Sequence, residues 1–138
     1  EGQAAIELES LAFDVPNAGS YAFEILVDHA ESLVVDTRPL IAEVWRDAGR
    51  GCDEKVVARR FHSTLVEVIA AVCTRLRAKT SLETVVLSGG VFLNALLSSE
   101  VAARLSADGF KVYRHRLVPP NDGGLALGQA AIAAALQR

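Results

Sequence analysis

The chain has 138 residues, of which 51% are hydrophobic and 22% charged, with a net charge of −3. This length and balance predict one ordinary globular domain over residues 1–138. Lysine and arginine form no cluster, which argues against a nucleic-acid partner, and no apolar run approaches the roughly 18 residues of a membrane span. The chain does not start with a basic segment followed by an apolar run, as a secretion signal does, so the sequence favours a cytoplasmic protein.

The cysteine and methionine content adds two expectations. Cys52 and Cys73 fit no metal or redox spacing, and we interpret them as free thiols in a reducing cytoplasm. Methionine is absent, and residues 1–3 already resemble the start of a helix. Because a native polypeptide starts with methionine, we expect the chain to be part of a longer protein or a processed product.

The first half of the chain predicts a helix, a hairpin and two more helices. Helical spacing of apolar residues covers 4–13, and two runs rich in β-branched and aromatic residues, 21–27 and 33–35, flank a turn at 28–32. The second helix begins at an N-cap in 36–37 and ends at 49–51. Asp53 caps the longest helix, and its predicted buried stripe consists of Val57, Phe61, Leu65, Val68, Val72 and Leu76. Trp45 and the other aromatic residues are assigned to the core.

After Thr80 the pattern changes to strand, helix, strand, helix. The strands are predicted at 84–87 and 110–115, and the helices at 91–107 and 124–137. The first strand is apolar after Thr84, as expected of a strand covered on both faces. This order predicts parallel pairing with a right-handed crossover, so the predicted fold class is α/β.

The first strand-to-helix junction contains paired glycines, Gly89 and Gly90. Bare backbone there permits close approach of a ligand, and a helix N-terminus favours negative charge. The glycines can also serve close packing alone. Neither a P-loop nor a dinucleotide fingerprint is present. Asn94, placed one turn into the helix, is interpreted as a contact to sugar or phosphate, or as a cap of the turn.

The second junction follows two prolines and reads Asn121, Asp122, Gly123 and Gly124. Asp122 has two interpretations: an N-cap of the terminal helix, or a contact to a divalent cation beside bare backbone. Because the carboxyl ends of parallel strands meet at one edge of a sheet, we expect both glycine turns to converge on a single crevice. The sequence therefore predicts a nucleotide or phosphate site there.

The three histidines form no metal-binding spacing. His62 is interpreted as a satisfied core imidazole on the long helix, and His29 as solvated in a turn. His115 follows the strand before the proline loop, and it is expected near the crevice without an assigned role. Ser88 lacks the sequence of a hydrolase nucleophile elbow.

Two motifs carry a resemblance to a known family. The segments LSGGVFLN at 87–94 and VPPNDGGLALGQ at 118–129 closely resemble the C-terminal end of the HypF carbamoyltransferases of nickel–iron hydrogenase maturation. Shorter matches are GQAAIELE at 2–9, RPL at 38–40 and ARRFH at 58–62. The likeness covers essentially the whole chain. A more distant likeness, through the GGVxxN pattern, is to enzymes that make threonylcarbamoyl-adenosine in tRNA.

The resemblance implies one lobe of the actin, sugar-kinase and heat-shock-ATPase fold. It implies use of carbamoyl phosphate and ATP, formation of carbamoyl-adenylate, and transfer of the carbamoyl group to the C-terminal cysteine of a HypE-type partner. By the same carry-over, Gly89, Gly90 and Asn94 lie against the nucleotide phosphates, and Glu7 contacts the ribose. Asp122 is a ligand of a zinc or iron ion, in a loop shaped by residues 121–124.

Departures from the family pattern limit what this chain can do alone. The upstream domains and the histidine cluster that would complete the metal site are missing, and no catalytic residue is assigned. We therefore expect the isolated chain to be inactive and to bind nucleotide weakly. Two alternatives stay open: a nucleotide-binding or docking module acting on a partner, and the lobe of another carbamoyltransferase or a kinase-like phosphotransferase.

Overall fold

The computed structural model describes residues 2–30 and 32–137. Glu1, predicted at the start of the first helix, and Glu31, in the predicted hairpin turn, lie outside them. The helices are α1 (Gln3–Ala12), α2 (Arg38–Gly49), α3 (Glu54–Thr80), α4 (Ala95–Ala107) and α5 (Leu125–Leu136). The strands are β1 (Glu24–Val27), β2 (Leu33–Asp36), β3 (Thr84–Leu87) and β4 (Lys111–Arg114). Two short 3-10 helices, η1 (Gly90–Leu93) and η2 (Asp122–Gly124), follow β3 and β4.

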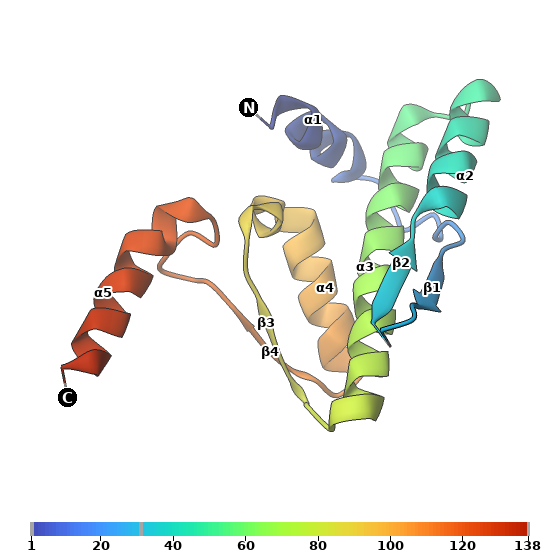
Figure 1. Ribbon diagram of the computed structural model, residues 1–138. Coiled ribbons are helices and arrows are strands. Elements are labelled where there is room, and N and C mark those ends of the chain that lie inside the picture. Colours follow the sequence, from blue (N-terminus) through green and yellow to red (C-terminus); the bar gives the residue numbers. More distant parts are fainter. Residues whose placement is uncertain (1, 31, 138) are drawn as a thin grey trace.

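The predicted α/β architecture is confirmed (Figure 1). Strands β3 and β4 pair in parallel, and α4 crosses between them and packs against α3. Strands β1 and β2 form the predicted antiparallel hairpin, beside α3 in Figure 1. Helix α5 lies on the side of the β3–β4 sheet opposite α3 and α4 and projects away from the rest of the chain, and it has no buried residue.

The predicted starts of the helices are largely confirmed. The Asp53 carboxylate accepts a hydrogen bond from the Lys55 N–H at 2.8 Å and caps α3. At α2 the N-cap position is Thr37, but the side chain that accepts a backbone N–H is that of Asp36, from Arg38 at 3.0 Å. The Arg38 guanidinium also bonds this carboxylate, and together these contacts lower the pKa of Asp36 to about 2.

The predicted buried stripe of α3 is wrong by about one position. The stripe residues are only half-buried, and Leu76 is 44% exposed. The deeply buried face mixes small and polar side chains: Ala58, Arg59, His62, Ser63, Thr64, Val66 and Ala70. This face packs against α1 and α4, and it tolerates polar groups because hydrogen bonds satisfy them.

The main core lies between α3, α4 and the parallel sheet. Its buried residues are Val66, Ala70, Leu87, Leu97, Val101, Leu105 and Phe110. Within the described chain, β3 is covered on one face only, since Leu87 is buried whereas Val86 is 63% exposed, so the prediction of two covered faces is wrong. The assignment of all aromatic residues to the core is also wrong: Phe110 is buried, but Trp45 on α2 is 81% exposed.

No helix in the described part of the chain combines the length and the apolar character required to span a bilayer.

Candidate functional site at the two glycine turns

The parallel register of β3 and β4 brings the two glycine turns together. Leu87 pairs with Arg114 at the last position of the ladder, so the next residues, Ser88 and His115, leave the same edge of the sheet. Beyond that edge the Gly89 N–H donates to the Pro120 carbonyl oxygen at 2.8 Å. The expected convergence of the turns is therefore confirmed.

A cavity of about 360 Å³ lies between the two turns, and we call it the glycine cavity. It opens beyond the carboxyl ends of the strands, where open α/β sheets bind ligands. Its lining includes four of the predicted site residues in the turns themselves, together with Asp122. The full lining is Ser88, Gly89, Gly90, His115, Pro119, Pro120, Asn121, Asp122, Gly124, Leu125, Gly128, Gln129 and Ile132. Three predicted site residues, Glu7, Asn94 and Gly123, are not in this lining.

The described chain requires glycine at two positions of the turns, Gly89 and Gly124, and for different reasons. Gly89 has φ +102°, a conformation that L side chains rarely adopt. A Cβ on Gly124 would lie 2.7 Å from the Pro119 carbonyl oxygen, so this glycine is required by the packing of its own loop. Gly90 differs from both, because its Cβ would meet only the Asn121 Cβ at 3.9 Å. Nothing inside the described chain forbids a side chain at Gly90, which leaves its surface open to a ligand.

Backbone donors are available at the first turn. The N–H groups of Gly90 and Val91, which begin η1, have no hydrogen-bond acceptor among the described residues. The N-terminus of α4, in contrast, is already occupied: the Glu9 carboxylate accepts from the Ala95 N–H at 2.7 Å, and Asn94 Oδ1 accepts from the Leu97 N–H at 2.8 Å. The first N–H groups of α4 therefore already have acceptors, and the donors without an acceptor among the described residues belong to the turn; phosphate binding at this end of the helix stays a prediction.

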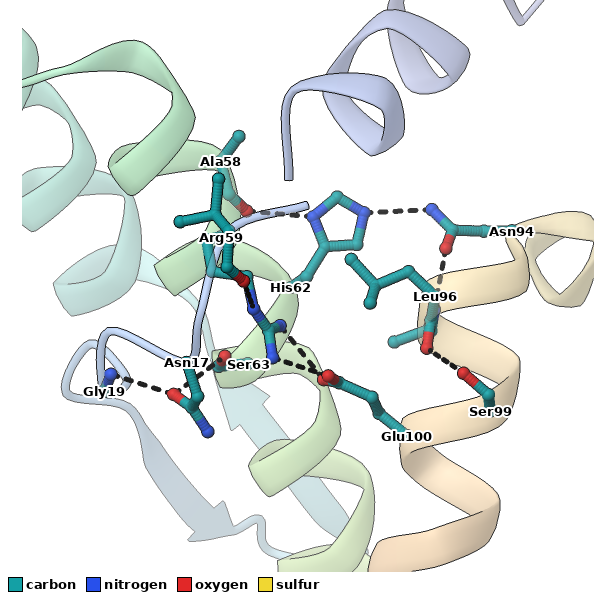
Figure 2. Close-up of polar contacts among 12 residues, drawn as sticks. Asn17, Gly19, Ala58, Arg59, His62, Ser63, Asn94, Leu96, Ser99 and Glu100 are labelled. Atoms are coloured by element: carbon teal, nitrogen blue, oxygen red, sulfur yellow. Dashed lines mark hydrogen bonds and ion pairs between the residues drawn. The ribbon is translucent and has the colours of Figure 1, made fainter. Parts of the chain in front are cut away.

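Asn94 caps α4 rather than lying one turn inside a helix. Its amide oxygen serves the cap, and its Nδ2 bonds His62 Nε2 at 2.9 Å (Figure 2). His62 Nδ1 lies 2.9 Å from the Ala58 carbonyl oxygen, which can only accept, so Nδ1 carries the proton and Nε2 accepts from Asn94. The prediction that His62 is a satisfied core imidazole is confirmed. This relay ties the glycine-turn end of α4 to the middle of α3.

An ion pair between the buried Arg59 and the half-buried Glu100 joins the same two helices (Figure 2). Arg59, only 4% exposed, donates to both carboxylate oxygens of Glu100 at 2.5 and 3.0 Å, and its Nε donates to the Val15 carbonyl at 3.0 Å. The relay and the ion pair fix how α4, and with it the first glycine turn, sits on α3.

The second turn separates the two interpretations of Asp122. Asn121, not Asp122, is the N-cap of η2: its side-chain oxygen accepts from the Gly123 N–H at 3.1 Å. The N-cap interpretation of Asp122 is wrong, and its exposed carboxylate has no hydrogen-bond partner among residues 2–30 and 32–137. Within those residues, no group of three or more histidine, cysteine or acidic side chains is placed to hold a metal ion. Asp122 can supply one oxygen ligand, and one carboxylate does not hold a metal by itself.

Glu7 lies away from the glycine cavity. It is exposed on α1, where it accepts from the Gln3 side chain at 2.8 Å. A second cavity of about 410 Å³ separates α1 from η1, and Gly90 is common to both cavities. The acidic residue that lines this second cavity is Glu9. The proposed ribose contact of Glu7 stays a prediction.

Sequence reasoning missed two contacts of the site. His115 Nε2 lies 3.1 Å from Ser88 Oγ, and both residues line the glycine cavity. Their signal was present in the sequence, since each immediately follows a predicted strand of a parallel pair. The bond from Glu9 to α4 spans 86 residues and has no local signal. His29, as predicted, is exposed in the hairpin turn.

Comparison with known proteins gives the geometry its context. Residues 1–129 match the family described as "Carbamoyltransferase, Kae1-like Domain, second subdomain". The chain belongs to this family. It is 35% identical to carbamoyltransferase HypF2 of Cupriavidus necator and 37% identical to carbamoyltransferase HypF of Rhizobium leguminosarum, matching 100% and 96% of this chain. The resemblance to HypF carbamoyltransferases, carried by the two glycine motifs, is thereby confirmed.

Solved structures agree over almost the whole chain. A crystal structure of full-length HypF "in the phosphate- and nucleotide-bound form" superimposes with a TM-score of 0.90 at 38% identity and covers 99% of this chain. HypF of T. kodakarensis gives a TM-score of 0.78 at 25% identity. The chain spans only 18% and 17% of these structures, and 19% and 16% of the Cupriavidus and Rhizobium proteins.

Proposed function

We propose that this chain is the C-terminal lobe of a carbamoyltransferase and supplies one wall of a nucleotide site. In the complete reaction, carbamoyl phosphate, water and ATP yield carbamoyl-adenylate, phosphate and pyrophosphate. The thiolate of a partner's C-terminal cysteine then attacks the carbamoyl carbon, and AMP leaves. The acceptor is a HypE-type protein, and the rest of the catalytic machinery belongs to upstream domains. We also propose that the complete protein is cytoplasmic, as the sequence predicts.

The proposal rests on one observation: the two glycine turns meet and line one cavity. The bond between Gly89 and Pro120 closes the junction, while Gly90 keeps an open surface beside the N–H groups of Gly90 and Val91, which have no acceptor within residues 2–30 and 32–137. Such donors suit the oxygen atoms of a phosphate chain. The solved relative that was crystallised with phosphate and nucleotide has the same fold at a TM-score of 0.90, which supports a nucleotide as the ligand.

Asp122 fits a metal ion only as a contributor. Its carboxylate is exposed in the glycine cavity and unpaired within the described chain, so it can complete a site whose other ligands come from elsewhere. A divalent ion there would polarise the carbamoyl oxygen and offset charge that develops during transfer. The residues of this chain orient the nucleotide, and Asp122 holds one coordination position.

The test uses the complete polypeptide that contains this lobe, supplied with ATP, carbamoyl phosphate and the acceptor protein. Mass spectrometry of the acceptor should show one carbamoyl group on its C-terminal cysteine. Gly90→Val should remove this product while leaving the melting temperature unchanged, because the valine side chain occupies ligand space and little else. Full activity of a correctly folded Gly90→Val variant would reject the proposed site.

A further inference from the structure

A phosphate chain in the glycine cavity would add negative charge beside Asp122, and one lining side chain can offset that charge. Asp122 brings a negative charge into the cavity, and a phosphate chain brings more. Among the described lining residues there is no lysine or arginine, and His115 is the side chain that can carry a positive charge. An anion in this cavity therefore has one cationic contact available from this chain.

His115 is also held in place by a specific contact. Its Nε2 lies 3.1 Å from Ser88 Oγ, and the parallel register puts both residues one step beyond the end of the β ladder. Nδ1, the other ring nitrogen, has no partner among residues 2–30 and 32–137. The neighbouring Arg114 and Arg116 line a different cavity, together with Ala102 of α4, and His115 lines both cavities.

The direction of the Ser88–His115 hydrogen bond determines what the free nitrogen can do. When Ser88 donates to Nε2, the neutral ring carries its proton on Nδ1 and presents a donor to the cavity. When the ring is protonated, Nε2–H donates to the hydroxyl oxygen and Nδ1–H is again a donor. In these two arrangements Nδ1 donates, which matches the acceptor oxygens of phosphate, whereas a neutral ring protonated on Nε2 would leave Nδ1 as an acceptor and would not bind them.

We propose that His115 is a contact to the phosphate groups of the bound nucleotide and that Ser88 is the positioning residue that orients its imidazole. This inference rests on the proposed function, and it adds a side-chain donor to the backbone donors of Gly90 and Val91. It assigns the phosphates to the side of the cavity formed by the ends of β3 and β4.

The test measures nucleotide binding to the 138-residue chain by nuclear magnetic resonance. The chain has three histidines, so three sets of imidazole resonances are assigned from His115→Gln and His29→Gln variants. ATP should shift the His115 imidazole and the Gly90 amide in a saturable way. His115→Gln should weaken ATP binding about tenfold, as expected for loss of a charge-assisted hydrogen bond, and should change adenosine binding by less than about twofold.

Matched variants separate contact from folding. His29→Gln changes an exposed histidine of the hairpin turn and should leave both affinities unchanged. Ser88→Ala should weaken ATP binding about threefold, whereas Ser88→Thr keeps the hydroxyl and should restore it. A rescue by threonine is not expected if Ser88 acts only through packing.

Two different failures can be told apart. If ATP shifts the Gly90 amide but binds His115→Gln as tightly as the unaltered chain, the nucleotide site stands and the role of His115 is refuted. If neither the Gly89 nor the Gly90 amide responds to saturating ATP while other residues do, the proposed function fails, and the inference fails with it.

Discussion

Gly90→Ala should weaken ligand binding and Gly124→Ala should destabilise the fold, although both glycines lie in turns that meet at the same cavity. A Cβ on Gly90 would have a single neighbour at an ordinary van der Waals distance of 3.9 Å. A Cβ on Gly124 would lie 2.7 Å from the Pro119 carbonyl oxygen and 2.9 Å from Val118 Cγ1, and a backbone atom cannot move aside cheaply. The two substitutions therefore separate ligand space from packing.

The structure sets the size of each effect. Gly124→Ala should destabilise the fold by about 2 kcal/mol, the usual cost of overpacking, which lowers the melting temperature of a domain of this size by about 8 °C. Gly90→Ala should leave the melting temperature unchanged or raise it slightly, because alanine reduces the entropy of the unfolded chain. If the phosphate chain lies against Gly90, the same substitution should weaken ATP binding at least about tenfold.

Thermal unfolding and ATP titration of both variants test this contrast. The reasoning is refuted if Gly90→Ala unfolds as early as Gly124→Ala, because Gly90 would then be a packing glycine. It is equally refuted if Gly90→Ala folds normally and binds ATP as well as the unaltered chain.

Three further outcomes follow from the contacts. Burial and the hydrogen bond to Asp47 raise the pKa of Tyr21 to about 12, so the free energy of unfolding should fall between about pH 10 and 12. Tyr21→Phe should remove this loss and should cost about 1 kcal/mol at pH 7, both measured by urea unfolding. Glu100→Gln should cost about 2 kcal/mol in the same assay by leaving the Arg59 charge unpaired, and a smaller loss than for Tyr21→Phe would contradict the buried pairing. Asp122→Asn in the complete polypeptide should lower metal content with melting unchanged, and the reverse result would return Asp122 to a structural role.

The sign of the tyrosine effect follows from its neighbours. Folding favours the neutral, protonated phenol, which is buried and donates to Asp47 at 2.9 Å. The stabilisation is complete below the pKa of an unfolded tyrosine, near 10, and disappears as the pH rises through the folded value.

Local signals in the sequence predicted much of the fold and the place of the site. The Asp53 cap and the hairpin depend on residues close in sequence, whereas the parallel pair follows from the order of strands and helices, and all three are present. The convergence of the glycine turns followed from one rule of sheet topology. These features are predictable because either neighbouring residues or the order of the elements determines them.

Contacts between distant residues were not predictable in this way. Asn94 has the appearance of a ligand residue, but its amide is engaged by α4 and by His62, which is 32 positions away. The buried face of α3 was misjudged because apolar spacing cannot show that Arg59 is neutralised by Glu100, 41 positions further on. Glu9 bonds the end of α4 from 86 residues away, so a helix N-terminus that looked free for phosphate already has an acceptor.

The most direct test of the central claim is a crystal structure of the complete polypeptide that contains this lobe, with a non-hydrolysable ATP analogue. The phosphate oxygens should lie in the glycine cavity, within about 3 Å of the Gly90 or Val91 N–H, with the ligand bounded on its other side by residues 121–124. A nucleotide bound at full occupancy in any other place, with the glycine cavity left to solvent, would contradict the account.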